Sequence, residues 1–170
     1  MTDTEFTLGR TTILVGDCRA ALRMLPTQSV HMAVTSPPYY GLRDYGVAGQ
    51  LGLETSVDAY INAMVDVFRE VWRVLRDDGT LWLNIGDSYA GSGKGPQGQM
   101  GVGAGRGVIG SGGMPSGTPR ENGVKAKSLM LIPFRLALAL QADGWLVRSD
   151  IAWCKTAPMP ESVTDRPTNA

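Results

Sequence analysis

Two consecutive prolines, Pro37 and Pro38, closely follow the apolar run at residues 30–34 (VHMAV). Each proline fixes its own φ and lacks a backbone N–H, so a strand in this run cannot continue through them. The strand must end in a rigid turn that presents the Ser36 hydroxyl, bare carbonyls and the ring of Tyr39. In open α/β sheets, ligands bind at the carboxyl ends of the strands. The sequence therefore predicts a ligand site at this turn.

The chemistry of the turn favours a flat ring that carries an exocyclic amino group. Such a ring can stack on Tyr39, while its amino protons go to the Ser36 oxygen and to a turn carbonyl. The alternative is a plain strand-ending turn with an exposed tyrosine, since prolines commonly follow strands. The tetrapeptide alone does not separate these interpretations, so the flanking segments must decide.

Upstream of the turn, the sequence predicts a strand, a short helix and a second strand. Residues 11–15 (TTILV) have the β-branched composition of a buried strand, residues 19–25 form a short helix, and residues 30–35 form the strand that enters the turn. Strands joined through a helix pair in parallel with a right-handed crossover, so we expect a β-α-β unit. Residues 1–10 are polar and are expected to be frayed or to form a short edge segment.

Downstream of the turn, a long helix and a third strand are predicted. Ser56 is suited to cap a helix, and apolar residues at helical spacing predict that helix over residues 57–75. The acidic pair and glycine at residues 77–79 are expected to end it, before a strand at residues 80–85 (TLWLNI). Strands alternating with helices indicate the α/β class.

The composition changes sharply in the second half of the chain. Residues 91–123 are mostly Gly, Ser and Pro, which predicts a flexible Gly-rich insertion. Residues 129–142 predict a buried helix with Pro133 in its first turn or two, and residues 145–154 alternate like a strand. The G-x-G-x-x-G match at residues 105–110 has no strand before it and no helix after it, so we reject it as a nucleotide-binding motif.

Length and charge narrow the class of protein. The chain has 170 residues, the size of one domain, and an apolar fraction of 43%. Its formal net charge is zero, so any contact with nucleic acid must come from a local patch. The two cysteines form no metal-ligand pattern and His31 is the only histidine, which argues against a zinc site. Unpaired cysteines, with no signal peptide and no membrane-length apolar run, indicate a cytoplasmic protein.

The order of these parts resembles one enzyme family. A strand, Gly-Asp, a short helix, a strand, S-P-P-Y, a loop, a long helix and a strand match the start of the permuted (beta-type) amino-methylating DNA methyltransferases, the DNA methylase N4/N6 family, whose motif is (D/N/S)-P-P-(Y/F). The Ser form, with Thr35 before it and Tyr-Tyr-Gly after it, looks most like the cytosine-N4 members. The resemblance implies an S-adenosylmethionine-dependent, Rossmann-like α/β fold, with a mostly parallel sheet flanked by helices and a long Gly-rich loop.

The resemblance also implies a role for each residue of the turn. Ser36 and the Pro37 carbonyl would accept the two amino protons of the target base, which frees the nitrogen lone pair for the incoming methyl group. Tyr39 would stack on the flipped base, and Pro38 would shape that pocket. Positioning would supply most of the rate enhancement, because the amine becomes acidic once it is methylated.

Other candidate residues flank the turn. Asp17 matches the family's acidic position near the adenine of S-adenosylmethionine, and it is equally suited to cap the helix at residues 19–25. The two roles are compatible. The loop after the motif offers polar and aromatic side chains that either border the pocket or are solvated: Tyr40, Arg43, Asp44 and Tyr45.

One departure from the family is clear. Its members bind S-adenosylmethionine through a Phe-x-Gly-x-Gly strand and turn that comes late in the permuted order, and this chain contains no such sequence. We therefore expect residues 1–170 to be the catalytic portion of an incomplete methyltransferase domain, an N-terminal fragment that lacks the cofactor-binding C-terminal part and is inactive alone.

Three functions stay open at this point. The resemblance favours a cytosine-N4 DNA methyltransferase, with an adenine-N6 enzyme as the close alternative. A non-catalytic nucleic-acid-binding module is a third interpretation, from a different class. For an enzyme, the implied partners are double-stranded DNA and a cognate restriction endonuclease.

Overall fold

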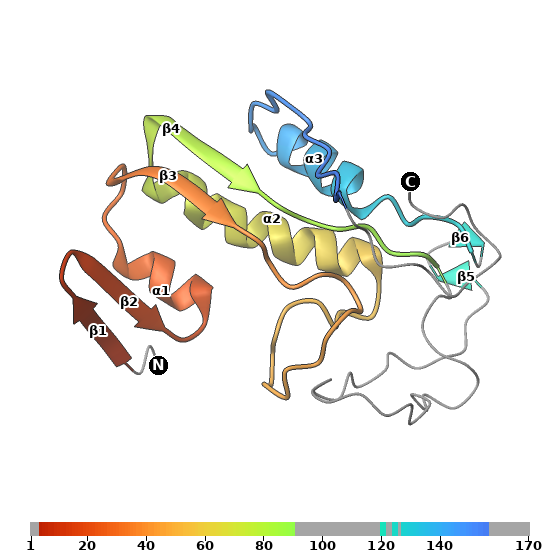
Figure 1. Cartoon of the computed structure of the whole chain (residues 1–170), viewed down its shortest axis with the longest axis horizontal. Coiled ribbons are helices and arrows are strands. Elements are labelled where there is room, and N and C mark those ends of the chain that lie inside the picture. The colour runs from red at the N-terminus through yellow and green to blue at the C-terminus, as the bar shows by residue number, and fades with distance from the viewer. Residues whose placement is uncertain (1–3, 91–119, 122–123, 126, 157–170) are drawn as a thin grey trace.

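The computed structural model describes residues 4–90, 120–121, 124–125 and 127–156 (Figure 1). The helices and strands follow in chain order: β1 (Thr4–Leu8), β2 (Thr11–Val15), α1 (Cys18–Met24), β3 (Val30–Thr35), α2 (Val57–Val74), β4 (Leu75–Leu83), β5 (Arg120–Glu121), β6 (Val124–Lys125) and α3 (Ile132–Ala142). The α/β class is confirmed. Of the three described strand pairings, one is parallel and two are antiparallel.

The parallel pair β3–β4 positions the predicted turn. The two strands run side by side, with Thr35 opposite Leu83, and helix α2 connects them along one face (Figure 1). Beyond the paired residues, the Asn84 amide still donates to the Thr35 carbonyl at 2.9 Å. Because parallel strands end at the same edge, the proline turn after β3 and the segment after β4 lie together.

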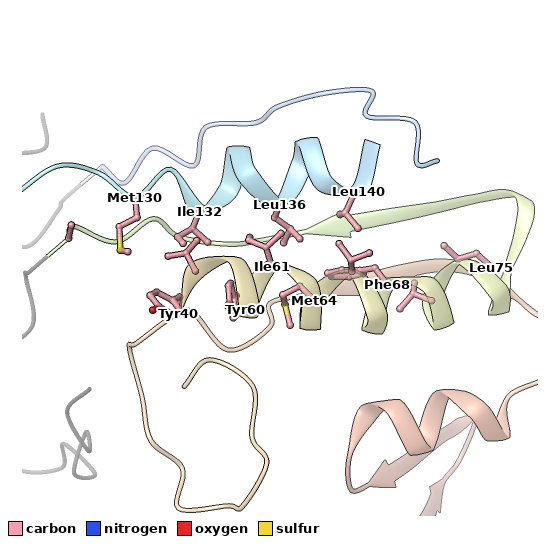
Figure 2. Packing of buried hydrophobic residues seen from close by; sticks show 14 residues of the cluster. Tyr40, Tyr60, Ile61, Met64, Phe68, Leu75, Met130, Ile132, Leu136 and Leu140 are labelled. Carbon is pink, nitrogen blue, oxygen red and sulfur yellow. The ribbon is translucent and has the colours of Figure 1, made fainter. Parts of the chain in front are cut away.

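The long helix α2 forms as predicted, one residue shorter at its end. The Ser56 hydroxyl accepts a hydrogen bond from the Ala59 amide at 3.1 Å, so Ser56 is the expected N-cap. Figure 2 shows Ile61 and Phe68 on the side of α2 toward α3, and the same buried cluster contains Met64, Ile132 and Leu136. This apolar contact between α2, α3 and the inner face of β4 is the core of the described chain.

The predicted break at residues 77–79 is wrong, because β4 starts directly at Leu75 and contains those residues. The pairing changes register between Val30 and Met32, so residues 76–79 bulge opposite the single residue His31. Gly79 permits this bulge, since a Cβ there would lie 2.9 Å from the Arg76 carbonyl oxygen. The acidic pair and glycine therefore lie in a bulge within β4 and do not end the helix, which ends at Val74.

The predicted β-α-β unit is also wrong at its first strand. β2 pairs antiparallel with β1 in a separate two-stranded sheet, and no described pairing joins β2 to β3. Residues 5–8 alternate polar and apolar side chains, and Gly9 has φ +61°, which suits a tight hairpin turn. A hairpin closes a much shorter loop than a crossover does, so the local pairing costs less entropy. The predicted short edge segment at residues 1–10 is therefore the strand β1.

The helix α3 begins at Ile132, with Pro133 in its first turn as predicted. The strand predicted for residues 145–154 is absent, and three of its apolar side chains, Leu146, Ile151 and Trp153, are largely exposed. A strand needs a neighbouring backbone to pair with, and none of the described strand pairings includes this segment. The predicted Gly-rich insertion at residues 91–123 lies outside the described residues, apart from β5.

Candidate functional site

The proline turn lines a cavity of about 310 Å³ at the end of β3. All four residues of the motif contribute to its wall, Ser36, Pro37, Pro38 and Tyr39, joined by Leu42, Arg43 and Tyr45 from the following loop. The hydroxyl, the aromatic ring and the guanidinium are the polar and flat groups of this wall. The structure therefore brings the predicted turn residues together around one open space.

Tyr39 is seated on the backbone that continues from β4. A Cβ built on Gly86 would lie only 2.8 Å from Cε2 of Tyr39, closer than real Cβ atoms approach. Glycine at this position is what allows the ring to lie there. The Ser36 hydroxyl donates a long hydrogen bond of 3.4 Å to the Tyr39 hydroxyl. This weak contact leaves the lone pairs of the Ser36 oxygen available to a donor in the cavity.

Tyr60 of α2 fixes the second proline of the turn. Its hydroxyl donates to the Pro38 carbonyl at 2.8 Å, and its ring is fully buried and tilted against Tyr40, with centroids 5.5 Å apart. Burial, followed by the charge of Glu54, raises the pKa of Tyr60 well above its usual range. Tyr60 thus stays a protonated donor at neutral pH. Among the described residues, the Pro38 carbonyl accepts this hydrogen bond and none is donated to the Pro37 carbonyl, whose residue also lines the cavity.

Of the four loop residues predicted to border the pocket, Arg43 and Tyr45 line the cavity and the other two do not. Tyr40 is only 4% exposed and belongs to the core (Figure 2). Asp44 accepts a hydrogen bond from the Gly46 amide at 2.7 Å. Arg43 and Tyr45 thus line the cavity, whereas Tyr40 packs in the core and Asp44 holds the conformation of the loop.

Asp17 caps α1, as one of its two predicted roles required. Its Oδ1 accepts from the Arg19 amide at 2.8 Å, and the side chains of Asp17 and Arg19 form an ion pair. Hydrogen bonds from the Arg19 side chain are the main reason that the pKa of Asp17 falls to about 2. Asp17 does not line the cavity, so its role toward a cofactor stays a prediction.

Asp87 is a structural residue that sequence reasoning missed. Its carboxylate accepts from the amides of Leu131 at 3.1 Å and Ile132 at 3.0 Å, and so caps α3 from a distant segment. Leu131 itself is left-handed, with φ 57°, and offers no side-chain cap. Asp87 follows Gly86 directly, so the segment that seats Tyr39 also anchors α3. The only sequence signal was an acidic residue at a strand end.

Two findings on the described residues concern membrane crossing and metal binding. No helix in the described part of the chain combines the length and the apolar character that a membrane crossing requires. Among the same residues, no group of three or more His, Cys, Asp or Glu side chains could hold a metal ion.

Comparison with known proteins identifies the family. A family model described as DNA methylase, N6_N4_Mtase, matches residues 30–170, so the chain belongs to this DNA methylase family. The Type II methyltransferase M.SmaI of Serratia marcescens is 49% identical over 158 residues, which are 93% of this chain and 52% of that protein. M.Cfr9I of Citrobacter freundii is 48% identical, over 96% of this chain and 52% of its own length.

The Type II methyltransferase M.SfiI of Streptomyces fimbriatus is 46% identical over 92% of this chain, but over only 33% of its own length. The chain thus spans about half the length of the first two relatives and less of the third. No solved structure matches the chain significantly.

Proposed function

We propose that the whole protein is a site-specific DNA methyltransferase that transfers a methyl group from S-adenosylmethionine to the exocyclic amine of a flipped base, with cytosine N4 favoured. The observation that carries this proposal is the turn itself. In a chain of the DNA methylase family, the S-P-P-Y residues line one cavity at the end of a parallel strand. Tyr60 donates to the Pro38 carbonyl, and the Tyr39 ring lies against Gly86.

In the proposed mechanism the turn grips the base by its amino group. The Ser36 oxygen and the Pro37 carbonyl accept hydrogen bonds from the two N–H groups of the amine, which localises the lone pair on the nitrogen; once methylated, the nitrogen releases one of these protons to solvent. Tyr39 stacks on the ring of the base, and Pro38 limits how far that ring enters. Tyr60 contributes by donating its hydroxyl hydrogen bond to the Pro38 carbonyl oxygen at 2.8 Å, which fixes the direction of the neighbouring Pro37 carbonyl. The rate enhancement comes from this preorganised geometry.

The residues that line the cavity suit the base that receives the methyl group, and not the cofactor that donates it. The cavity is lined by neutral and aromatic groups and one guanidinium, and no carboxylate among its lining residues could pair with the sulfonium or the ribose of S-adenosylmethionine. Asp17, the predicted cofactor residue, lies outside that wall. Family membership supports S-adenosylmethionine as the methyl donor.

Adenine N6 is the second candidate for the methylated atom. Both bases present an amino group next to a ring nitrogen, and the turn reads only the amino group. Serine in the first motif position favours cytosine. The names of the relatives as Type II methyltransferases support a cognate restriction endonuclease as a functional partner.

The test is methyl transfer by the whole protein. Labelled S-adenosylmethionine is incubated with duplex DNA, and the DNA is digested to nucleosides and separated. We expect label in N4-methylcytosine, whereas label in N6-methyladenine would establish the second candidate. DNA that is bound but unlabelled would refute the methyltransferase proposal and support a non-catalytic binding module. A variant with Ser36→Ala and Tyr39→Ala in the same assay is expected to lose the label.

A further inference from the structure

The loop after the proline turn is closed at its base. The Gly41 amide donates to the Gly52 carbonyl at 2.7 Å, which joins the two ends of residues 41–52. Gly52 also packs tightly on the turn, since a Cβ there would lie 3.0 Å from the Tyr39 carbonyl oxygen. The loop is therefore attached to the turn and shares its position.

A single side chain braces the middle of this loop. The Gln50 amide group donates to the Arg43 carbonyl at 2.9 Å and accepts from the Tyr45 amide at 2.7 Å. Asp44, between these two residues, is fixed by its own bond to the Gly46 amide. A loop with four glycines would otherwise have a large conformational entropy to lose on binding. Gln50 therefore pre-orders the backbone from which Arg43 and Tyr45 project.

Both braced residues present their side chains to the cavity. Arg43 and Tyr45 line the same wall as the S-P-P-Y turn, and Tyr45 is 54% exposed. Five other arginines of the described chain pair with carboxylates, Arg19, Arg69, Arg73, Arg76 and Arg135, whereas Arg23 does not. No carboxylate among the described residues pairs with the Arg43 guanidinium. An unpaired guanidinium beside a cavity is suited to a bidentate contact with an oxyanion such as a phosphate.

We propose that residues 41–52 form a second wall for the flipped nucleotide, which deepens the proposed function and rests on it. Arg43 binds a backbone phosphate next to the flipped base, Tyr45 stacks against that nucleotide, and Gln50 is a positioning residue for both. Base stacking on an aromatic side chain and phosphate contacts by arginine are the two common sources of affinity for an extruded nucleotide. The loop supplies one of each, on a backbone that is already ordered.

The experiment measures binding of duplex DNA by the whole protein over a series of salt concentrations. Arg43→Gln removes one phosphate contact, so the negative slope of log affinity against log salt concentration should become less steep by about 0.9. Arg23→Gln is the matched control, because Arg23 lies on α1, lacks a carboxylate partner among the described residues and does not line the cavity. Its slope should equal that of the wild type.

Steady-state kinetics test the aromatic and the brace. Tyr45→Ala should raise KM for DNA about ten-fold, and Tyr45→Phe should recover most of that loss because it keeps the stacking surface. Gln50→Ala does not change the Arg43 and Tyr45 side chains themselves, yet it should also raise KM for DNA, because the backbone that positions them loses its hydrogen bonds to Gln50. The thermal unfolding of Arg43→Gln and Tyr45→Ala should match that of the wild type, since both side chains are exposed.

Two results would overturn the second wall while the proposed function survives. One is an unchanged salt slope in Arg43→Gln, in a protein that does methylate DNA. The other is an Arg43→Gln variant whose affinity for S-adenosylmethionine falls instead, which would assign the guanidinium to the cofactor carboxylate. If the wild type labels no DNA, the proposed function has failed, and the salt slope then decides the phosphate contact by itself.

Discussion

Replacing Tyr60 by Phe removes one oxygen atom and tests how the proline turn is held. The ring stays buried with the same shape, so packing in the core is kept, but the Pro38 carbonyl loses the donor that lies 2.8 Å away. A buried acceptor left without a partner costs about 1–3 kcal/mol. Pro38 is only half-buried and water can reach it in part, so we expect a loss of about 1 kcal/mol in the free energy of unfolding.

The effect on catalysis should exceed the effect on stability. Once released, the Pro38 carbonyl can turn, which moves the neighbouring Pro37 carbonyl that is proposed to accept an amino proton. A displacement of about 1 Å at a reacting group can reduce the rate by about a hundred-fold, so a loss of ten-fold or more in kcat is expected for Tyr60→Phe.

A second variant on the same helix separates these two effects. Val71→Ala removes two methyl groups from the core, about 1–2 kcal/mol, about three turns of α2 away from the turn. Denaturant unfolding and methyl transfer are measured for Val71→Ala and Tyr60→Phe in parallel. If kcat falls no further in Tyr60→Phe than in Val71→Ala, Tyr60 does not position the turn. Equal unfolding free energies for wild type and Tyr60→Phe would refute the hydrogen bond itself.

Three further predictions concern the seat, the cap and the charge pair. Gly86→Ala should unfold like the wild type but lose methyl transfer, because the new Cβ, 2.8 Å from the Tyr39 ring, displaces a side chain that can move; full activity would refute the seat. Asp87→Ala should cost about 1–2 kcal/mol in unfolding free energy by uncapping α3, and Asp87→Asn less; equal losses would argue against the cap. The pKa of Asp17 is lowered to about 2, so its stabilising contribution is present above the unfolded pKa of about 3.9 and is lost as pH falls toward 2. The difference in unfolding free energy between wild type and Asp17→Asn should therefore vanish over that pH range. A constant difference would contradict the ion pair with Arg19.

Local signals in the sequence located the long helix and the turn. The helix α2 was predicted to within one residue because its cap and its apolar spacing act within a few residues of each other. The turn was predicted for the same reason, since Pro37 and Pro38 restrict the backbone wherever they occur. The prediction of a strand at residues 145–154 was wrong. Alternation of polar and apolar residues indicates which face of a strand would be buried, but it does not supply a neighbouring strand for backbone hydrogen bonds.

The parts of the site that the sequence did not reveal are contacts between distant segments. Tyr60 lies 22 residues after Pro38 in the chain, and its place in the sequence indicates only an apolar position on a helix. Gly86 had no visible reason to be glycine until the Tyr39 ring was placed above it. Asp87 caps a helix that begins 45 residues later. None of these pairs leaves a pattern in a single sequence, because any buried tyrosine or strand-end glycine looks the same.

By itself, the sequence determined the chemistry on offer: a stiff corner with a hydroxyl, bare carbonyls and an aromatic ring, placed directly after an apolar strand. Proline geometry and side-chain type are properties of the residues themselves, so they hold before the chain folds. Only the tertiary structure decided which carbonyl Tyr60 binds, what the Tyr39 ring rests on and which loop residues line the cavity. Those outcomes depend on where α2, β4 and the loop at residues 41–52 meet, and the burial of apolar surface across the whole chain sets that arrangement.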